Sequence, residues 1–198
     1  MNCDRTYFSN ICIDLTERCN IRCRHCILDV NEPGKPPGWA VIERLITEAA
    51  DLQEIQEIAF VGGEPFLEYQ TLVKSVALCR RKGLRSSVVT NGYWAKNATA
   101  ANKMLGELDG LTTLSVSTDR FHQEFVPVEN IKNVIVSCHE LGIECHVYIS
   151  HLNHPENEVE AVRNQLAGLE EYYSVHQQPV LYMGRAAKEL DRESIFTY

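Results

Sequence analysis

The chain has 198 residues, of which 44% are hydrophobic and 23% charged, and this composition is typical of one globular domain with a substantial core. Its formal net charge of −8 argues against nucleic acid or an acidic membrane surface as the main partner. No apolar run approaches the roughly eighteen residues of a membrane span, and the N-terminus MNCDRTYFSN lacks the regions of a signal peptide. We therefore predict a single domain over residues 1–198, located in the cytoplasm, with no nucleic acid and no membrane among its partners.

Strands and helices are predicted to alternate along the chain. A short strand at 11–15 precedes the cysteine-rich stretch CNIRCRHC, a Pro/Gly-rich loop at 31–38 and a helix over 39–52. The pattern then predicts strands at 57–61, 85–90, 112–117, 144–149 and 178–183, and helices at about 67–81, at 98–108, at 128–141 and from 155. Repeated strand–helix units indicate an α/β fold with parallel strands and right-handed crossovers. Six units are too few for an eight-stranded barrel, so we expect a partial (β/α)6 TIM-like barrel.

Polar, glycine-rich and thiol-bearing segments follow the predicted strands. In chain order they are CNIRCRHC, Gly62-Gly63-Glu64-Pro65, Thr90-Asn91-Gly92, Ser115-Val116-Ser117-Thr118-Asp119, His151 and Gly184-Arg185. The C-terminal ends of parallel strands meet at one edge of a sheet, where active sites collect. We therefore expect one functional rim.

Eight cysteines are spread unevenly along the chain, with Cys19, Cys23 and Cys26 in one group and five others single. A secreted disulfide scaffold is normally shorter and more evenly laced with cysteines. We therefore expect free thiols in a reducing compartment. The group is interpreted as a metal site, and the single cysteines as small buried apolar side chains.

The spacing of the three cysteines also matches one face of a helix. Arginines surround them and no apolar stripe continues that face, so three core cysteines explain the pattern poorly. Structural zinc uses four Cys or His ligands, usually in two pairs, but His25 abuts Cys26 and no second CxxC is present. A ferredoxin cluster also needs four cysteines. Three thiolates without a fourth suit an iron–sulfur cluster that keeps one iron open.

The pattern CxxxCxxC after the first strand, followed by GGEP after the second, resembles the radical S-adenosylmethionine (SAM) superfamily over about residues 6–187. The resemblance implies that Cys19, Cys23 and Cys26 ligate three irons of a [4Fe–4S] cluster and that S-adenosyl-L-methionine chelates the fourth. It implies reductive cleavage of SAM to a 5′-deoxyadenosyl radical that abstracts hydrogen from a substrate. It further implies an electron donor of the flavodoxin or ferredoxin type.

The resemblance also assigns contacts to SAM. Gly62-Gly63-Glu64 resembles the motif that meets the SAM amino group, where glycines permit close backbone approach and Glu64 supplies an acceptor. His25 resembles an aromatic position whose backbone lies near adenine. Ser117 and Asp119 resemble the family's ribose and carboxylate contacts.

Further candidates lie along the predicted rim. Asn91 is counted with the cofactor-binding residues. Ser115 is counted with them because it shares a strand face with Ser117, but a role in a turn would explain Ser115 equally well. His122 and Asp119 are the candidates for catalysis, through substrate recognition or proton handling. Arg185, in a segment that resembles the GRA of peptide-modifying radical SAM enzymes, would bind SAM or substrate, or lie on the surface.

The GRA segment favours a peptide or protein side chain as the substrate. Two alternatives stay open, an activase that installs a glycyl radical on a large partner and a non-catalytic iron–sulfur or zinc protein. Many peptide-modifying relatives carry a cysteine-rich C-terminal domain. We therefore expect either a minimal enzyme or a core that lacks such an extension.

Overall fold

The computed structural model describes residues 9–29, 35–153 and 155–195. One sheet contains six strands in chain order, and every neighbouring pair is parallel. The strands are β1 (Asn10–Thr16), β2 (Glu57–Gly62), β3 (Arg85–Thr90), β4 (Thr113–Ser117), β5 (Glu144–His151) and β6 (Ser174–Pro179). This order confirms the expected α/β fold with a partial TIM-like barrel.

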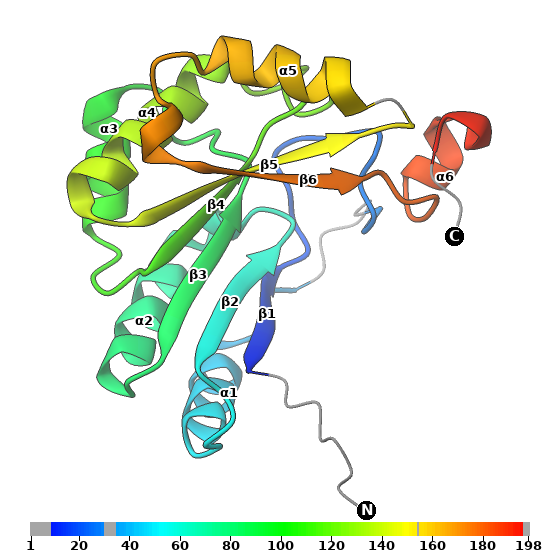
Figure 1. Ribbon diagram of the computed structural model, residues 1–198. Helices are drawn as coiled ribbons and strands as arrows, with labels where there is room; N and C mark the ends of the chain where they lie inside the picture. The colour runs from blue at the N-terminus through cyan, green and yellow to red at the C-terminus, as the bar shows by residue number, and fades with distance from the viewer. Residues whose placement is uncertain (1–8, 30–34, 154, 196–198) are drawn as a thin grey trace, which may run out of the picture.

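Helices connect the strands and cover the outer side of the curved sheet (Figure 1). They are α1 (Trp39–Ala50), α2 (Tyr69–Arg81), α3 (Ala98–Gly106), α4 (Val128–Leu141) and α5 (Pro155–Gln165), and the short α6 (Ala186–Glu189) follows the last strand. Short 3₁₀ segments lie at Pro65–Glu68, Glu170–Tyr172 and Arg192–Ser194. Parallel neighbours require a crossover between each pair of strands, and the helices provide it.

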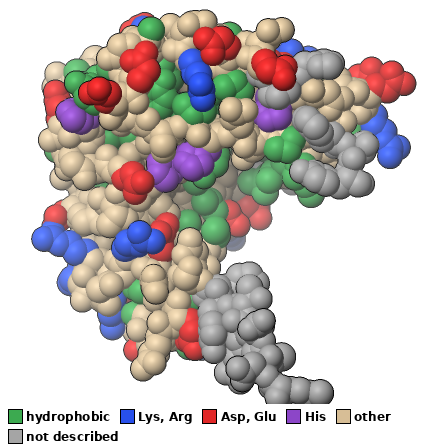
Figure 2. Space-filling model, viewed as in Figure 1, with side chains coloured by type: hydrophobic (Ala, Val, Ile, Leu, Met, Phe, Trp, Pro, Cys, Tyr) green, Lys and Arg blue, Asp and Glu red, His purple; other side chains and the backbone are tan. Residues whose placement is uncertain are grey.

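Alternation along the strands separates a buried outer face from an open inner face. In β1, Ile13 and Leu15 are buried in the core, whereas Cys12 and Asp14 are exposed. Figure 2 shows histidine side chains gathered over β5 and β6 on the open side. The rings of His146 and His176 lie 4.6 Å apart there, and Tyr148 stacks on His176 at 4.9 Å. The inner face is therefore polar and accessible.

Helix α4 begins and ends where the sequence predicts. Pro127 precedes it with an extended backbone, and Gly142 ends it in the left-handed region at φ 68°, which a glycine adopts without strain. Ile131 and Ile135 are buried as the 3.6-residue period predicts, but Leu141 is 42% exposed because it lies at the helix end. Local signals therefore set this element.

The predicted last strand at 178–183 is wrong. Strand β6 pairs Ser174 with His146 and Pro179 with His151, so it ends four residues earlier than expected. Its sequence SVHQQP is polar because it is an edge strand with one partner and an open inner face. The more apolar residues after it leave the sheet, and Val180 packs with Cys23, Phe121, Ala186 and Ile195 in a second core cluster.

The single cysteines mostly follow the expectation. Cys79, Cys138 and Cys145 are buried, whereas Cys12 is exposed on the inner face of β1. Cys3 lies outside the described residues. Within the described ranges, no helix is both long and apolar enough to cross a membrane.

Candidate functional site

The three grouped cysteines line one cavity of about 440 Å³ at the C-terminal ends of the strands. Their loop follows β1 and makes a turn in which the Cys26 amide donates to the Cys23 carbonyl at 3.2 Å, so it is not a helix face. Burial raises the pKa of the Cys19 thiol to about 11, against the lowering effect of a backbone hydrogen bond. A thiol with so high a pKa is neutral unless a metal displaces its proton.

Gly62 and Gly63 let the end of β2 lie directly on the beginning of the cysteine loop. A Cβ at Gly62 would lie 2.3 Å from the Thr16 carbonyl oxygen, and one at Gly63 would lie 2.1 Å from that of Arg18. Two hydrogen bonds fix the contact, from the Gly63 amide to Thr16 at 2.7 Å and from the Glu64 amide to Arg18 at 2.9 Å. The glycines therefore shape the protein scaffold of the cavity.

Glu64 is fully buried and does not line the cavity. Its carboxylate accepts hydrogen bonds from the Thr90 hydroxyl at 2.8 Å, the Asn91 amide at 2.8 Å and the Phe66 amide at 3.1 Å. Burial raises the pKa of Glu64 to about 7, although these donors oppose the shift. Glu64 thus joins the loop after β2 to the end of β3.

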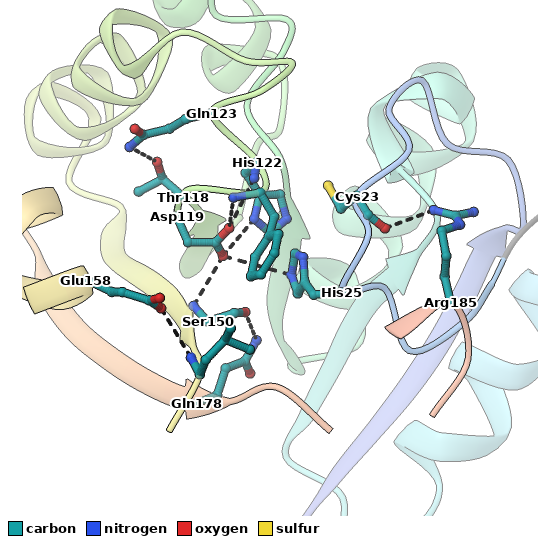
Figure 3. Close-up of polar contacts among 12 residues, drawn as sticks. Cys23, His25, Thr118, Asp119, His122, Gln123, Ser150, Glu158, Gln178 and Arg185 are labelled. Atoms are coloured by element: carbon teal, nitrogen blue, oxygen red, sulfur yellow. Dashed lines mark hydrogen bonds and ion pairs between the residues drawn. The ribbon is translucent and has the colours of Figure 1, made fainter. Parts of the chain in front are cut away.

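Asp119 is also buried and lies behind the cavity wall. Its carboxylate accepts from the backbone amides of Phe121 at 2.9 Å and Ser150 at 3.2 Å, and it contacts the His122 ring nitrogen Nδ1 at 2.9 Å (Figure 3). Although burial alone disfavours charge on both groups, their attraction raises the pKa of His122 to about 10 and lowers that of Asp119. Asp119 therefore holds His122 as a cation at the cavity.

His25 lines the same cavity and stacks on Phe121 with ring centroids 4.7 Å apart. Burial lowers its pKa to about 4, so the ring is neutral at pH 7, even though Asp119 lies 3.9 Å away. The metal-ligating atoms of Cys23, His25 and His122 lie within 4.8 Å of one another. These three side chains could also hold a single metal ion.

Arg185 is buried, with 3% of its surface exposed, and clamps the cysteine loop. Its side chain donates to the Cys23 carbonyl at 3.1 Å (Figure 3). Its backbone amide donates to the Cys26 carbonyl at 2.8 Å. A Cβ at the preceding Gly184 would lie 2.2 Å from the Ile27 carbonyl oxygen, so the two segments are in backbone contact. The surface alternative for Arg185 is wrong.

The structure brings most of the predicted site residues together and leaves three aside. The cavity is lined by Cys19, Cys23, Cys26, His25, Gly62, Gly63, Asn91, Ser117, His122 and Arg185. Glu64, Ser115 and Asp119 do not line it. The roles assigned to all of these residues stay predictions.

Several lining residues were missed in the sequence. Asp14, Ser150 and Gln178 line the cavity, and Gln178 donates to the Ser150 hydroxyl at 3.1 Å. Alternation in β1 and β5 could have identified Asp14 and Ser150 on the inner face. Gln178 was placed at the beginning of a strand that in fact ends at Pro179.

The residues around the cavity fit a [4Fe–4S] cluster with one further polar ligand. Three thiols face the same space, and within the described ranges no other cysteine lines it. The His25 nitrogen Nδ1 is buried and has no hydrogen-bond partner in the described part of the chain. A buried polar atom without a partner is costly, but this atom has no exposed surface, so the fit to a cluster rests on the three thiols.

Comparison with protein families and with known proteins finds sequence relatives of this chain. The family model described as "Radical SAM superfamily" matches residues 13–166. YydG of Bacillus subtilis, whose name assigns it provisionally to peptide biosynthesis, is 23% identical over 202 residues, which cover 97% of this chain and 61% of YydG. A 7,8-dihydro-6-hydroxymethylpterin dimethyltransferase of Methanocaldococcus jannaschii is 28% identical over 87% of this chain and 36% of its own length. The chain thus spans about a third to three fifths of these relatives.

Solved structures share the fold. SuiB of Streptococcus suis, bound to S-adenosylmethionine, superposes with a TM-score of 0.69 at 15% identity, over 96% of this chain and 43% of SuiB. TsrM of Kitasatospora setae, a radical SAM methyltransferase with cobalamin and a [4Fe–4S] cluster, gives 0.61 at 18% identity, over 89% of this chain and 38% of TsrM. At these identities the likeness concerns the fold.

Proposed function

The chain belongs to the radical SAM superfamily, an enzyme family whose cofactors are a [4Fe–4S] cluster and SAM, and we propose that Cys19, Cys23 and Cys26 hold this cluster for reductive cleavage of SAM. The observation that carries the proposal is the meeting of the three thiols in one cavity with the glycine loop after β2. When bound, the cluster and SAM supply an electron and a 5′-deoxyadenosyl radical that takes hydrogen from a substrate.

The side chains of this chain would bind SAM and exclude water. Ser117, at the end of β4, presents a hydroxyl to the cavity and suits a sugar hydroxyl. His122, held as a cation by Asp119, suits a carboxylate. Ile27 and Leu28 line the cavity and are about half exposed, so bound SAM would cover their apolar surface and displace water from it.

The substrate that we propose is a peptide or protein side chain. Supporting it are the GRA segment, the peptide biosynthesis named for YydG and the open polar face beside the cavity. Ser117 of the cavity wall pairs with Tyr148, which pairs with His176, so ring and hydroxyl groups continue from the cavity across the open face. An extended peptide can use such hydrogen-bonding groups along its length.

A low-potential one-electron protein of the flavodoxin or ferredoxin type is proposed as the electron donor. The cytoplasm is proposed as the location because thiols that bind a cluster need a reducing compartment. Residues 1–198 are proposed to be one radical SAM core domain. The comparisons give no support to a glycyl-radical activase or to a non-catalytic metal protein.

Anaerobic reconstitution with iron and sulfide tests the proposed reaction. With SAM and dithionite, the wild-type chain should form 5′-deoxyadenosine, and Cys19→Ala, Cys23→Ala and Cys26→Ala should not. Cys79→Ala is the matched control, because Cys79 lies in α2 and outside the cavity. A wild-type protein that carries iron and sulfide but forms no 5′-deoxyadenosine would contradict the proposal. A mass shift in a short peptide encoded beside this gene would test the substrate class.

A further inference from the structure

The Asn91 side chain lies at the junction of three loops of the cavity. It is 6% exposed and belongs to the turn after β3. Its backbone amide donates to Glu64 at 2.8 Å, which fixes it to the loop after β2. Its side-chain nitrogen Nδ2 lies 3.0 Å from Asn20 Oδ1 and 3.9 Å from Cys19 Sγ.

The orientation of this amide follows from its other contact. The Asn91 oxygen Oδ1 accepts a hydrogen bond from the Tyr93 backbone amide at 3.0 Å. A backbone amide can only donate, so the oxygen must lie on that side and the NH₂ group must face Asn20 and Cys19. The NH₂ group has two acceptors within reach, the side-chain oxygen Oδ1 of Asn20 and the Cys19 sulfur.

We propose that Asn91 is a positioning residue whose amide hydrogen bond to Cys19 Sγ raises the reduction potential of the [4Fe–4S] cluster. The proposal rests on the proposed function, since it requires a cluster on Cys19. Hydrogen bonds to cluster sulfurs set part of the potential of iron–sulfur centres. Reduction adds negative charge to the cluster and its ligands, and a donor at the sulfur stabilises the reduced state more than the oxidised state.

The neutral amide suits this role in a buried place. Glu64 and Cys19 lie on either side of it, and both are desolvated, since burial raises the pKa of each. An amide supplies a partial positive charge at the sulfur without the desolvation cost of a buried cation. The Glu64 contact fixes the backbone of Asn91, so the donor keeps its position when the cluster changes charge.

The test measures the midpoint potential of the reconstituted cluster without SAM. A dye-mediated redox titration monitored by EPR gives this potential. Asn91→Ser and Asn91→Asp should each lower the midpoint. For Asn91→Ser we expect a roughly three- to tenfold smaller equilibrium constant for reduction, or about 30–60 mV for a one-electron couple. Asn91→Asp keeps the acceptor for Tyr93 but cannot donate when ionised, and it should shift the midpoint at least as far.

Asn20→Ala is the matched control, because it removes the other acceptor of the same NH₂ group and leaves the sulfur contact. It should leave the midpoint within error of wild type. A midpoint unchanged in both Asn91 variants, or shifted equally by Asn20→Ala, would overturn the proposal. The proposal would also be overturned if both Asn91 variants had the circular dichroism spectrum of the wild type but failed to load iron. The amide would then act only on the structure of the loop. A wild-type chain that assembles no [4Fe–4S] cluster would instead contradict the proposed function.

Discussion

Replacement of the buried Glu64 tests how the loops of the cavity are held together. Glu64→Ala removes the acceptor of two buried backbone amides, those of Phe66 and Asn91, and of the Thr90 hydroxyl. A buried donor that loses its partner costs about 1–3 kcal/mol, so the two amides together predict a loss of about 2–6 kcal/mol in the free energy of unfolding. Urea unfolding of the metal-free chain under reducing conditions, followed by circular dichroism, measures it.

The same residue predicts a dependence on pH. Because the folded-state pKa of Glu64 is raised to about 7, its contribution is fully present below the ordinary glutamate pKa and is lost as pH rises through about 7. At about 1.4 kcal/mol per pKa unit, this loss amounts to about 3 kcal/mol. Glu64→Gln has nothing to titrate, so wild type should lose stability relative to this variant between about pH 5 and pH 8.

Glu48→Ala is the control for Glu64, since Glu48 lies on the surface of α1 in an exposed pair with Arg44. It should leave the urea midpoint unchanged. A Glu64→Ala variant as stable as this control, or a Glu64→Gln variant whose stability runs parallel to wild type over the pH range, would refute the reasoning.

Three further changes address the cysteine loop and its supports. Arg185→Leu removes the donor to the Cys23 carbonyl and should lower the iron content after reconstitution several-fold. Arg81→Leu, on the exposed last turn of α2 and away from the cavity, should not; equal iron contents would contradict the clamp. Gly63→Ala places a Cβ 2.1 Å from the Arg18 carbonyl and should lower the melting temperature by several degrees, with Gly106→Ala, which has open space, as control; equal melting temperatures would refute the close approach. Asp119→Asn removes the attraction that opposes burial, so it should lower the pKa of His122 from about 10 to its ordinary range or below. NMR of the ring protons measures it, and an unchanged titration would show that Asp119 does not hold the charge.

The fold could be predicted largely because its signals are local. Helix α4 has a proline before it, a glycine after it and an apolar stripe between them, and β3 occupies the predicted residues 85–90. Strand β6 could not be found in this way. Its polar His176 and Gln178 lie on the inner face of the open barrel, while the apolar Val180 beyond it packs against the cysteine loop in a separate core cluster.

The site was predictable to the level of which loops meet, because parallel strands bring their C-terminal ends to one edge. The direction of each side chain was not. Glu64 and Asp119 were expected to face SAM, but each is turned inward to satisfy backbone amides of a neighbouring strand end or loop. Arg185 is buried because the chain after β6 folds back over the cysteine loop, a contact between residues 162 positions apart.

The open iron is the central claim, and EPR of the reduced cluster with and without SAM tests it most directly. Three cysteine ligands leave one iron free, so addition of SAM to the reconstituted and reduced wild-type chain should change the g values of the signal. Cys79→Ala should respond in the same way. A [4Fe–4S] signal that SAM leaves unchanged, or a protein that binds one zinc through Cys23, His25 and His122 and assembles no cluster, would contradict the account.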